Sequence, residues 1–476
     1  MRAPFEYAGG STTHSQNVTI DDQYTQNYYP EIEGPGATAQ ISLRPTPGLL
    51  RLFDAGVGPA RSDGIEFMGK LYYVSGNKLI ECATDLASGV EVGTLSTNGG
   101  RVSMDASPTE LGIVDGTSIY RWDGTTFSTI ADADAPNGAN TITWLDFYFI
   151  CEVSGTGRFQ ISALNDLTSW DALDFATAES SRDDLIAVKA TTNELWLIGE
   201  WTTEIYYNSG NPIFPFEPMG HGVIMVGTKS PHTVRLNQNG ELTWLATYRE
   251  GGFDIIKAST GGRQIISDAN IARRINDQSS NNIDDAYASV YGQAGHSFYV
   301  LNFPDGSTPI TMVYDYRTTF WHDRLCYGLT RHRCAGIGYY NKKVVVFDYN
   351  GSTVYQWKLD QYDDNGDMIQ RIRRMAILSN NGLPLMIDSI EIEFKPGTAG
   401  AADQTFQVAL RYSKTGRDGT YTPDLVRTNK QGEYKGRFKW GPLGRGYRFH
   451  IETTVTSKAE VVVGKAYLNV RSGFNA

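Results

Sequence analysis

The sequence predicts an all-β protein, in which a β-propeller of six to eight blades is followed by an antiparallel β-sandwich. Three observations lead to this prediction: a turn-rich composition, a recurring β-hairpin pattern, and short alternating strands near the C-terminus. Glycine contributes 50 of the 476 residues and aromatic residues make up 12%, whereas only 20% of the residues are charged. This composition is typical of a turn-rich β protein and argues against a coiled coil or a disordered chain.

The hairpin pattern recurs from about residue 65 onwards. Each copy joins an apolar strand to a second strand rich in Tyr, Ile and Trp, across a turn built on Gly, Asn or Asp. The spacing is roughly 37 to 55 residues, close to that of propeller blades. Because a four-stranded unit cannot bury both of its faces alone, we expect radial stacking, with a set of sandwiches as the alternative. The copies occupy residues 67–82, 110–124, 145–162, 193–210, 240–258, 295–316 and 341–359.

The turns of these hairpins are expected to be exposed. Gly76, Gly116, Gly124 and Gly351 lie where the pattern places a turn. Glycine adopts a positive φ without a steric penalty, so we expect these four positions to use that conformation.

The length of the chain and its flanking segments indicate three parts. Residues 1–60 contain frequent Pro and Gly and are expected to be mostly irregular, but residues 49–53 (LLRLF) could supply the strand that closes the ring. The propeller is predicted over residues 61–366. A sandwich is predicted over 367–476, because apolar residues alternate there with polar ones. The alternating residues are Ile390, Ile392 and Phe394; Phe406, Val408, Leu410 and Tyr412; and Tyr447, Phe449 and Ile451.

Charge is distributed unevenly along the chain. Residues 368–476 hold 17 basic and 9 acidic residues, a net charge of +8; since the whole chain carries −11, the first 367 residues carry −19. An acidic body joined to a basic C-terminal segment indicates two partners or two faces, although two ordinary domains of opposite charge would give the same numbers.

The sequence gives little sign of export, membrane insertion or disulfide bonding. The first residues lack the apolar core of a secretory signal, and no apolar run approaches the roughly 20 residues of a membrane helix. We therefore expect assembly in the cytoplasm and no membrane insertion. Four cysteines are too few for a disulfide framework in a chain of this length, so we expect free thiols. They are Cys82, Cys151, Cys326 and Cys334.

Two segments have residue types that bind metals, but neither has the usual spacing. In the first, the order H-x3-C-x5-H-x-C matches no common zinc pattern, and Arg331 and Arg333 add positive charge. The second, residues 360–367, is rich in Asp, but an EF-hand alignment puts Gln361 and Ile372 at ligand positions, so a turn is predicted. We expect no metal or other cofactor. The residues of the first segment are His322, Cys326, His332 and Cys334.

Catalytic residues are not predicted either. Propeller glycosidases need converging carboxylates, and six acidic residues of this chain are candidates. Of these, Asp115 and Asp123 are most simply turn residues before Gly116 and Gly124. No nucleophile elbow, zincin or phosphate-loop motif is present. A propeller glycan hydrolase or carbohydrate-binding tail protein remains the alternative function. Its candidate acids are Asp105, Asp115, Asp123, Glu194, Glu200 and Glu204.

Several stretches resemble the packaged-DNA-stabilisation family of tailed bacteriophages, the tail-nozzle or tail-hub proteins of short-tailed phages. The most specific stretch is residues 195–234, and together the stretches cover most of the first 375 residues. The basic sandwich matches only by position and pattern. The similar stretches are residues 26–31, 43–53, 100–124, 165–180, 195–234 and 361–374.

The resemblance implies a structural virion protein that is not an enzyme. Such proteins form a ring of six copies below the portal and adaptor rings, retain packaged DNA and conduct it during ejection. The implied partners are copies of the chain itself, the portal or adaptor ring, a tail fibre or tailspike, needle or plug proteins, and passing DNA without sequence-specific binding.

Two surfaces are candidates for binding a partner. One is the aromatic loop with Phe214, Phe216 and Met219, which is about equally well interpreted as a plug in its own blade interface. The other begins the basic segment. Its residues are Arg371, Arg373 and Arg374.

Overall fold

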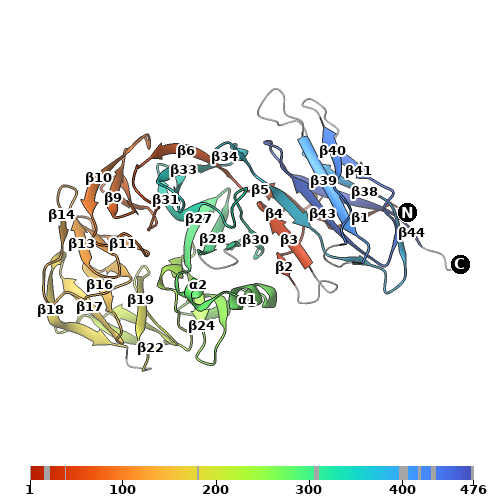
Figure 1. Cartoon of the computed structure of the whole chain (residues 1–476). Helices are drawn as coiled ribbons and strands as arrows, with labels where there is room; N and C mark the ends of the chain where they lie inside the picture. The colour runs from red at the N-terminus through yellow and green to blue at the C-terminus, as the bar shows by residue number, and fades with distance from the viewer. Residues whose placement is uncertain are drawn as a thin grey trace. The chain divides into compact units, whose positions relative to one another are not determined.

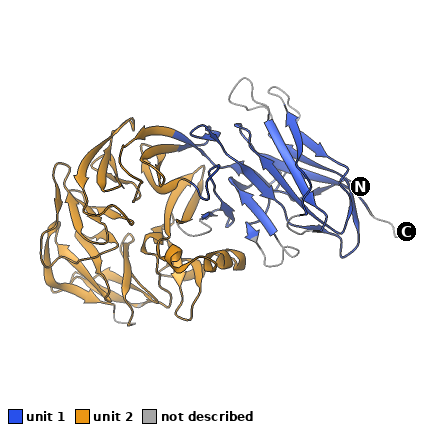
Figure 2. Ribbon diagram, in the orientation of Figure 1, with its two compact units in different colours: residues 1–50, 310–332, 357–476 blue, residues 51–309, 333–356 orange. Residues whose placement is uncertain are grey.

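The computed structural model describes residues 2–14, 22–37, 39–178, 182–304, 310–395, 406–415, 420–429 and 436–472. Over these residues the regular secondary structure is almost entirely β-strand, as predicted. It forms two compact units (Figure 2): unit 1 contains residues 1–50, 310–332 and 357–476, and unit 2 contains residues 51–309 and 333–356. These units divide the chain at other positions than the predicted domain limits, which remain predictions.

Unit 2 is a β-propeller, in which four-stranded antiparallel sheets follow one another round a ring (Figure 1). Five sheets use consecutive strands. The first contains β7 (Ile65–Phe67), β8 (Lys70–Ser75), β9 (Lys78–Cys82) and β10 (Gly89–Thr94). The second contains β11 (Ser103–Ala106), β12 (Leu111–Val114), β13 (Ile119–Trp122) and β14 (Phe127–Thr129). The third contains β15 (Ile142–Leu145), β16 (Tyr148–Val153), β17 (Arg158–Ala163) and β18 (Asp166–Thr177).

The fourth and fifth sheets repeat this order. The fourth contains β19 (Leu185–Ala190), β20 (Leu195–Gly199), β21 (Thr203–Asn208) and β22 (Phe216–Ile224). The fifth contains β23 (Arg235–Leu236), β24 (Leu242–Thr247), β25 (Phe253–Ser259) and β26 (Gly262–Ile265). A short 3₁₀ helix, η1 (Pro231–Thr233), precedes β23, and the helices α1 (Ala269–Asn276) and α2 (Ser280–Asp284) follow β26. The hairpin of β27 (Tyr287–Gln293) and β28 (His296–Phe303) comes next.

A sixth sheet contains a strand from near the N-terminus. Its order is β31-β32-β33-β6, where β31 is Cys334–Tyr340, β32 is Lys343–Asp348, β33 is Thr353–Lys358 and β6 is Gly48–Asp54. Residues 49–53 therefore supply the ring-closing strand that the sequence predicted. With five four-stranded sheets and this sixth sheet among the described residues, the propeller lies within the predicted range of six to eight blades. The turn of the predicted hairpin at 295–316 lies outside the described residues.

The strand β20 illustrates why these sheets stack. All five of its residues are buried, and alternate side chains enter two different clusters. Trp196 and Ile198 pack with Trp244 of the fifth sheet, whereas Leu195 and Leu197 pack with residues of the third sheet. Because side chains of a strand alternate between faces, both faces of this sheet are apolar and each is covered by a neighbouring sheet.

The turn glycines agree with the predictions only in part. Gly116 is exposed with a φ of 81°, as expected. Gly76 has a positive φ but is buried, and Gly124 has a positive φ but is half-buried. The prediction for Gly351 is wrong, because this half-buried residue has no positive φ.

Unit 1 is a sandwich of two sheets. In one, the strand order is β4-β5-β44-β38-β41, with β1 paired to β44 and β42 paired to β38. Its strands are β1 (Arg2–Phe5), β4 (Tyr28–Ile32), β5 (Ile41–Pro45), β38 (Leu385–Phe394), β41 (Arg437–Trp440), β42 (Gly444–Gly446) and β44 (Val463–Ser472).

Within unit 1 the second sheet has the order β29-β30-β3-β36-β43-β39-β40, with β2 paired to β3 and β37 to β43. The apolar side chains of β38 and β44 pack with those of β39 and β43 in one core, which confirms a C-terminal sandwich. Tyr447 is exposed and precedes β43, contrary to its predicted place in the alternation. The strands are β2 (Thr13–His14), β3 (Asp22–Gln26), β29 (Ile310–Asp315), β30 (Trp321–Asp323), β36 (Arg371–Arg374), β37 (Leu378–Ser379), β39 (Phe406–Ser413), β40 (Leu425–Asn429) and β43 (Arg448–Val455).

The N-terminal segment is far less irregular than predicted. Residues 1–50 contribute β1 to β5 to the two sheets of unit 1, and Tyr28 and Leu43 lie in the core of this unit. The prediction failed because these strands are short and contain prolines, such as Pro30 in β4 and Pro45 in β5. Two of the pairings are local, β2 with β3 and β4 with β5. The others are not, because β1 pairs with β44 and β3 with β36, hundreds of residues away in the sequence.

Candidate functional site at the propeller axis

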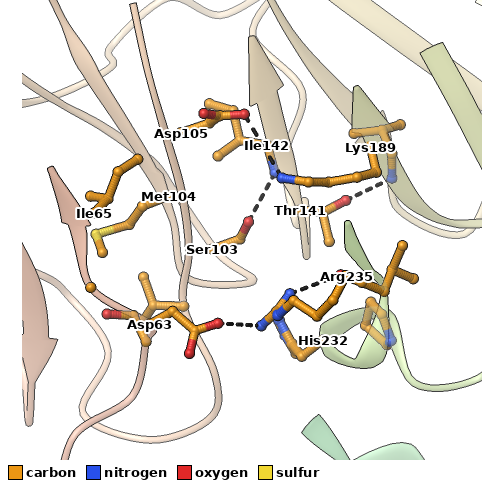
Figure 3. A pocket seen from close by; sticks show the side chains of 16 residues that line it. Asp63, Ile65, Ser103, Met104, Asp105, Thr141, Ile142, Lys189, His232 and Arg235 are labelled. Carbon is orange, nitrogen blue, oxygen red and sulfur yellow. Dashed lines mark hydrogen bonds and ion pairs between the residues drawn. The ribbon is translucent and has the colours of Figure 1, made fainter. Parts of the chain in front are cut away.

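A cavity of about 210 Å³ lies where the first strands of the five consecutive-strand sheets meet (Figure 3). Residues of β7, β11, β15, β19 and β23, with η1 and the residues just before β7, line this cavity. Charged side chains project into it from separate sheets: Asp63, Asp105, Lys189 and Arg235. A polar axial cavity is where a propeller would bind a small ligand, so the contacts of these groups decide what the site can do.

Asp63 joins three distant parts of unit 2. One carboxylate oxygen, Oδ2, lies 2.8 Å from Nη2 of Arg235. The other, Oδ1, accepts a hydrogen bond from Oγ of Ser289 at 2.6 Å and one from the backbone nitrogen of Ile337 at 2.9 Å. Arg235 also donates through Nε to the carbonyl oxygen of Ala288 at 2.7 Å. The charged groups of Asp63 and Arg235 are therefore engaged in contacts within the protein, and these contacts connect different strands of unit 2.

Asp105 makes a similar connection between the second, third and fourth sheets. Its Oδ2 accepts hydrogen bonds from Oγ1 of Thr143 at 3.0 Å and from the backbone nitrogen of Trp144 at 3.1 Å. Oγ1 of Thr143 in turn accepts from the backbone nitrogen of Ala190 at 3.0 Å. Lys189 lies at 4.0 Å from the same carboxylate oxygen. These contacts connect β11, β15 and β19, the first strands of the second, third and fourth sheets.

Glu152 supports the cavity wall from inside the third sheet. It is fully buried, and its carboxylate accepts hydrogen bonds from Oγ1 of Thr141 at 2.7 Å, from the backbone nitrogen of Thr141 at 2.9 Å and from that of Asn140. Burial raises the pKa of Glu152 to about 7, because desolvation outweighs the three hydrogen bonds that favour the ionised form. Thr141 also accepts from the backbone nitrogen of Val188 at 2.8 Å, which links Glu152 to the next sheet.

His232 is the one histidine among the residues that line the cavity. Burial, together with the nearby positive charges of Arg101 and Arg235, holds the pKa of His232 well below its usual value. His232 is therefore neutral at physiological pH.

The carboxylates considered for a hydrolase do not gather at the axis. Of the six, only Asp105 lines the cavity. Asp115 and Asp123 accept hydrogen bonds from the backbone of their own turns, which confirms the turn prediction. Glu194 contacts Nε1 of Trp196 at 2.9 Å, and Glu200 contacts Lys229 at 3.4 Å. The sixth candidate, Glu204, lies buried on β21.

The aromatic loop packs on its own propeller. Phe216 is buried and Phe214 is half-buried, and both pack in the cluster between the third and fourth sheets. Their rings meet Tyr148 and Phe159, at centroid distances of 6.0 Å and 5.7 Å. Met219 packs on the cluster between the fourth and fifth sheets. The geometry thus favours the plug interpretation for Phe214 and Phe216, and partner binding by this loop stays a prediction.

The three arginines at the start of the basic segment lie mostly inside unit 1. Arg371 and Arg373 are buried. Arg373 donates to Tyr7, Thr25, Gln23 and Gly9. These two side chains could meet a partner only after local unfolding, so their burial gives them a structural role.

Arg374 is partly exposed, with 16% of its side chain accessible. It pairs with Asp22 at 2.9 Å and with Glu452 at 2.8 Å. Partner binding at these arginines is still a prediction.

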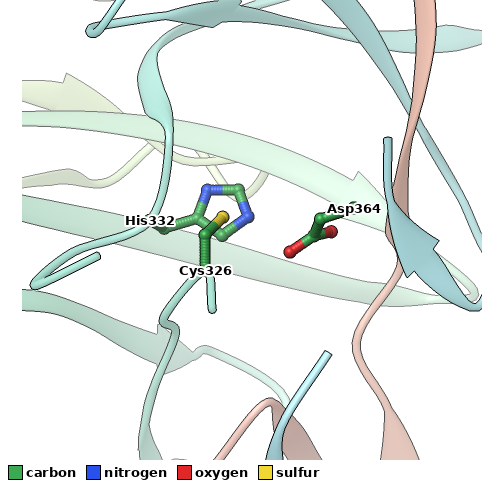
Figure 4. A group of neighbouring side chains, drawn as sticks. All are labelled: Cys326, His332 and Asp364. Atoms are coloured by element: carbon green, nitrogen blue, oxygen red, sulfur yellow. The ribbon is translucent and has the colours of Figure 1, made fainter. Parts of the chain in front are cut away.

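The residues considered for a metal are brought together only in part. Ligand atoms of Cys326 and His332 lie near each other and near Asp364, all three within 4.8 Å of one another (Figure 4). His322 is buried on β30, and Cys334 belongs to unit 2. Burial raises the pKa of Asp364 to about 6.

The sequence does not reveal Asp364 as a candidate metal ligand, because its neighbours form the predicted turn. The strands β34 (Asp363–Asp364) and β35 (Asp367–Met368) pair across Asn365 and Gly366, both of which have a positive φ. This turn alone accounts for the Asp-rich composition of residues 360–367. Only the parallel pairing of Asp364 with Leu49 of β6 places its side chain inside unit 1.

The fold and the axial cavity define a propeller protein whose charged axial groups connect neighbouring sheets. A family model described as "Bacteriophage P22 Gp10, beta-propeller" matches residues 3–361. The chain therefore belongs to this family of bacteriophage structural proteins, as the sequence resemblance predicted. A role in the virion follows from the family.

Within the described residues, no helix is long and apolar enough to cross a membrane.

The other comparisons add little. A crystal structure of the computationally designed Ika8 protein is similar at a TM-score of 0.38 and 11% identity, covering 74% of this chain and all of that one. The N-terminal domain of Nup159 is similar at a TM-score of 0.39 and 9% identity, covering 70% and 98%. Both scores lie below 0.5. No curated protein matches the chain.

Proposed function

We propose that this protein is a structural component of a phage tail nozzle. Copies of the chain form a ring, a hexamer, below the portal and adaptor rings, retain packaged DNA and conduct it during ejection. The observation that carries the proposal is membership of the bacteriophage Gp10 β-propeller family over most of the chain. In this role the protein works without catalysis, in keeping with axial carboxylates that are already engaged in hydrogen bonds and ion pairs.

The charge distribution supports a conduit. The first 367 residues carry −19, and this acidic part includes all of unit 2. A passage that bound phosphates would release counterions at each contact and hold the DNA in place. An acidic surface repels phosphates, so a duplex slides past it without sequence-specific binding.

The rigidity of the propeller suits a hub with several neighbours. Sheets joined at the axis by Asp63 and Asp105 present their outer loops from a fixed frame. We propose as neighbours the adjacent copies, the portal or adaptor ring, a tail fibre or tailspike, and needle or plug proteins. The +8 of residues 368–476 is complementary to the acidic part of an adjacent copy, which would fix their register. The protein does not insert into a membrane in this scheme.

Image reconstruction of intact tails tests the proposal. We expect six copies in a closed ring around the DNA exit path, with a bore lined by acidic and neutral side chains. A single copy in each tail, or a bore lined mainly by Lys and Arg, would overturn the conduit even with an intact propeller.

A further inference from the structure

Three side chains of unit 1 offer three different metal-ligand atoms at one point. Sγ of Cys326, an imidazole nitrogen of His332 and a carboxylate oxygen of Asp364 all lie within 4.8 Å of one another (Figure 4). Each residue is at least 97% buried. Thiolate, imidazole and carboxylate are donors that Zn²⁺ binds in proteins.

The backbone fixes these residues in place. Cys326 and His332 lie in the segment after β30, where the backbone nitrogen of Leu329 donates to the carbonyl oxygen of Cys326 at 3.1 Å. The backbone nitrogen of His332 donates to Oγ1 of Thr311 at 3.1 Å. Asp364 is held by the pairing of β34 with β6 at Leu49. Two segments, each anchored by backbone hydrogen bonds, therefore converge on the cluster.

The geometry needs only a small adjustment to hold an ion. Donor atoms on a tetrahedral zinc lie about 3.5 Å apart, given bond lengths of about 2.0 to 2.3 Å. Separations of up to 4.8 Å here would shorten by about 1 Å on binding, which is within the range of side-chain rotation.

Two positively charged groups act on the cluster. The guanidinium groups of Arg324 and Arg371 attract the carboxylate of Asp364. Arg324 is itself engaged: its Nη2 donates to the carbonyl oxygen of Pro47 at 2.9 Å, and its guanidinium lies 4.1 Å from the centre of the Trp357 ring. A thiolate and a carboxylate together neutralise a divalent ion.

We propose that Cys326, His332 and Asp364 form a binding site for a zinc ion that fastens the segment after β30 to β34 within unit 1. Binding releases the thiol proton of Cys326 to solvent, and the ion is held as a thiolate, imidazole and carboxylate complex. This site replaces, for Cys326, the expectation of a metal-free thiol that its sequence spacing gave. It is independent of the proposed role in the tail.

Cobalt provides the direct test, since Co²⁺ takes the same ligands as Zn²⁺ and absorbs visible light. The full-length chain is dialysed against a chelator and titrated with Co²⁺. We expect one ion per chain, with visible bands of tetrahedral cobalt and a near-ultraviolet thiolate-to-cobalt band. The variant Cys326→Ser should lose the thiolate band, and Asp364→Asn, which lacks the negative charge of the carboxylate ligand, should bind Co²⁺ more weakly. Cys334→Ser is the matched control and should titrate like the wild-type chain.

Thermal unfolding provides the second measurement. Zn²⁺ should raise the Tm of the wild-type chain and of Cys334→Ser, but not that of Cys326→Ser or Asp364→Asn. If Cys326→Ser does not fold, Asp364→Asn, which keeps the side-chain volume, carries the comparison. No stoichiometric binding by the wild-type chain, an unchanged thiolate band in Cys326→Ser, or equal Tm shifts in all four proteins would overturn the site.

Discussion

The carboxylate of Asp63 lies 2.8 Å from the guanidinium of Arg235, and the same carboxylate accepts hydrogen bonds from Ser289 and Ile337. One short side chain thus connects the segment before β7 with residues from three later parts of the propeller. Because these contacts link segments more than 170 residues apart, they stabilise the closed ring and not any single sheet.

Replacing Asp63 should destabilise the propeller, and more strongly when the new side chain cannot accept a hydrogen bond. Asp63→Ala leaves Ser289 and Ile337 without this acceptor and Arg235 without its ion-pair partner, and should lower the free energy of unfolding by about 3 kcal/mol. Asp63→Asn keeps an acceptor oxygen for Ser289 and Ile337 and should cost about 1 kcal/mol. Urea unfolding measures both, with the exposed Asp284→Ala as the control. Equal midpoints for Asp63→Ala and the control would contradict this role.

Glu152 should make the stability depend on pH. Its pKa is about 7 in the folded chain against 4.5 for an ordinary glutamate, so between these values the folded chain keeps a proton that the unfolded chain releases. Stability should therefore fall as pH rises from about 4.5 to about 7, by about 3 kcal/mol, and stay low above that.

The variant Glu152→Gln is uncharged at every pH and should lack this slope. The difference between wild-type and variant unfolding free energies, measured in urea at several pH values, isolates the contribution. Glu66→Gln, at an exposed position, is the control and should follow the wild-type profile. A constant difference between wild type and Glu152→Gln across the range would show that the carboxyl has no raised pKa.

Two turn glycines allow a test of backbone conformation without a change in packing. An added Cβ meets no atom within 4 Å at either Gly116 or Gly351, but only Gly116 has a positive φ. Gly116→Ala should therefore cost about 1 kcal/mol, whereas Gly351→Ala should leave stability unchanged or raise it slightly. Thermal or urea unfolding measures the stability of the two variants. Equal losses of unfolding free energy in both would refute the conformational explanation.

The aromatic loop contains a buried and an exposed apolar residue close together. Phe216 is 2% exposed and Ile213 is 86% exposed. Phe216→Ala should lower the unfolding free energy by about 3 to 5 kcal/mol, because it removes packing between the third and fourth sheets. Ile213→Ser should change it by less than about 0.5 kcal/mol.

The same pair of variants tests partner binding by this loop. If the loop docks on a neighbour in the tail, Ile213→Ser should fold normally but be incorporated less into particles. A Phe216→Ala chain as stable as the wild type would instead mean that Phe216 is not part of the core.

The sequence predicted most accurately what is local. Hairpin strands, the turn at Asp115 and the ring-closing role of residues 49–53 follow from alternation and turn residues, and the structure has all of them. It predicted least well what depends on distant pairing. The pairing of β1 with β44, the burial of Arg373 and the approach of Asp364 to Cys326 join segments that no local pattern relates.

The sixth sheet has a consequence for how the chain folds as it is made. β6 leaves the ribosome early, but β33, which pairs with it, and β31 and β32 of the same sheet are among the last propeller strands to be translated. Until then the growing chain holds an unpaired strand and an open array of sheets, both of which invite association with other chains. Contacts of such long sequence separation also form slowly. Completion of the ring therefore comes late in biosynthesis, and a chain truncated before β31 should depend on chaperones to stay in solution.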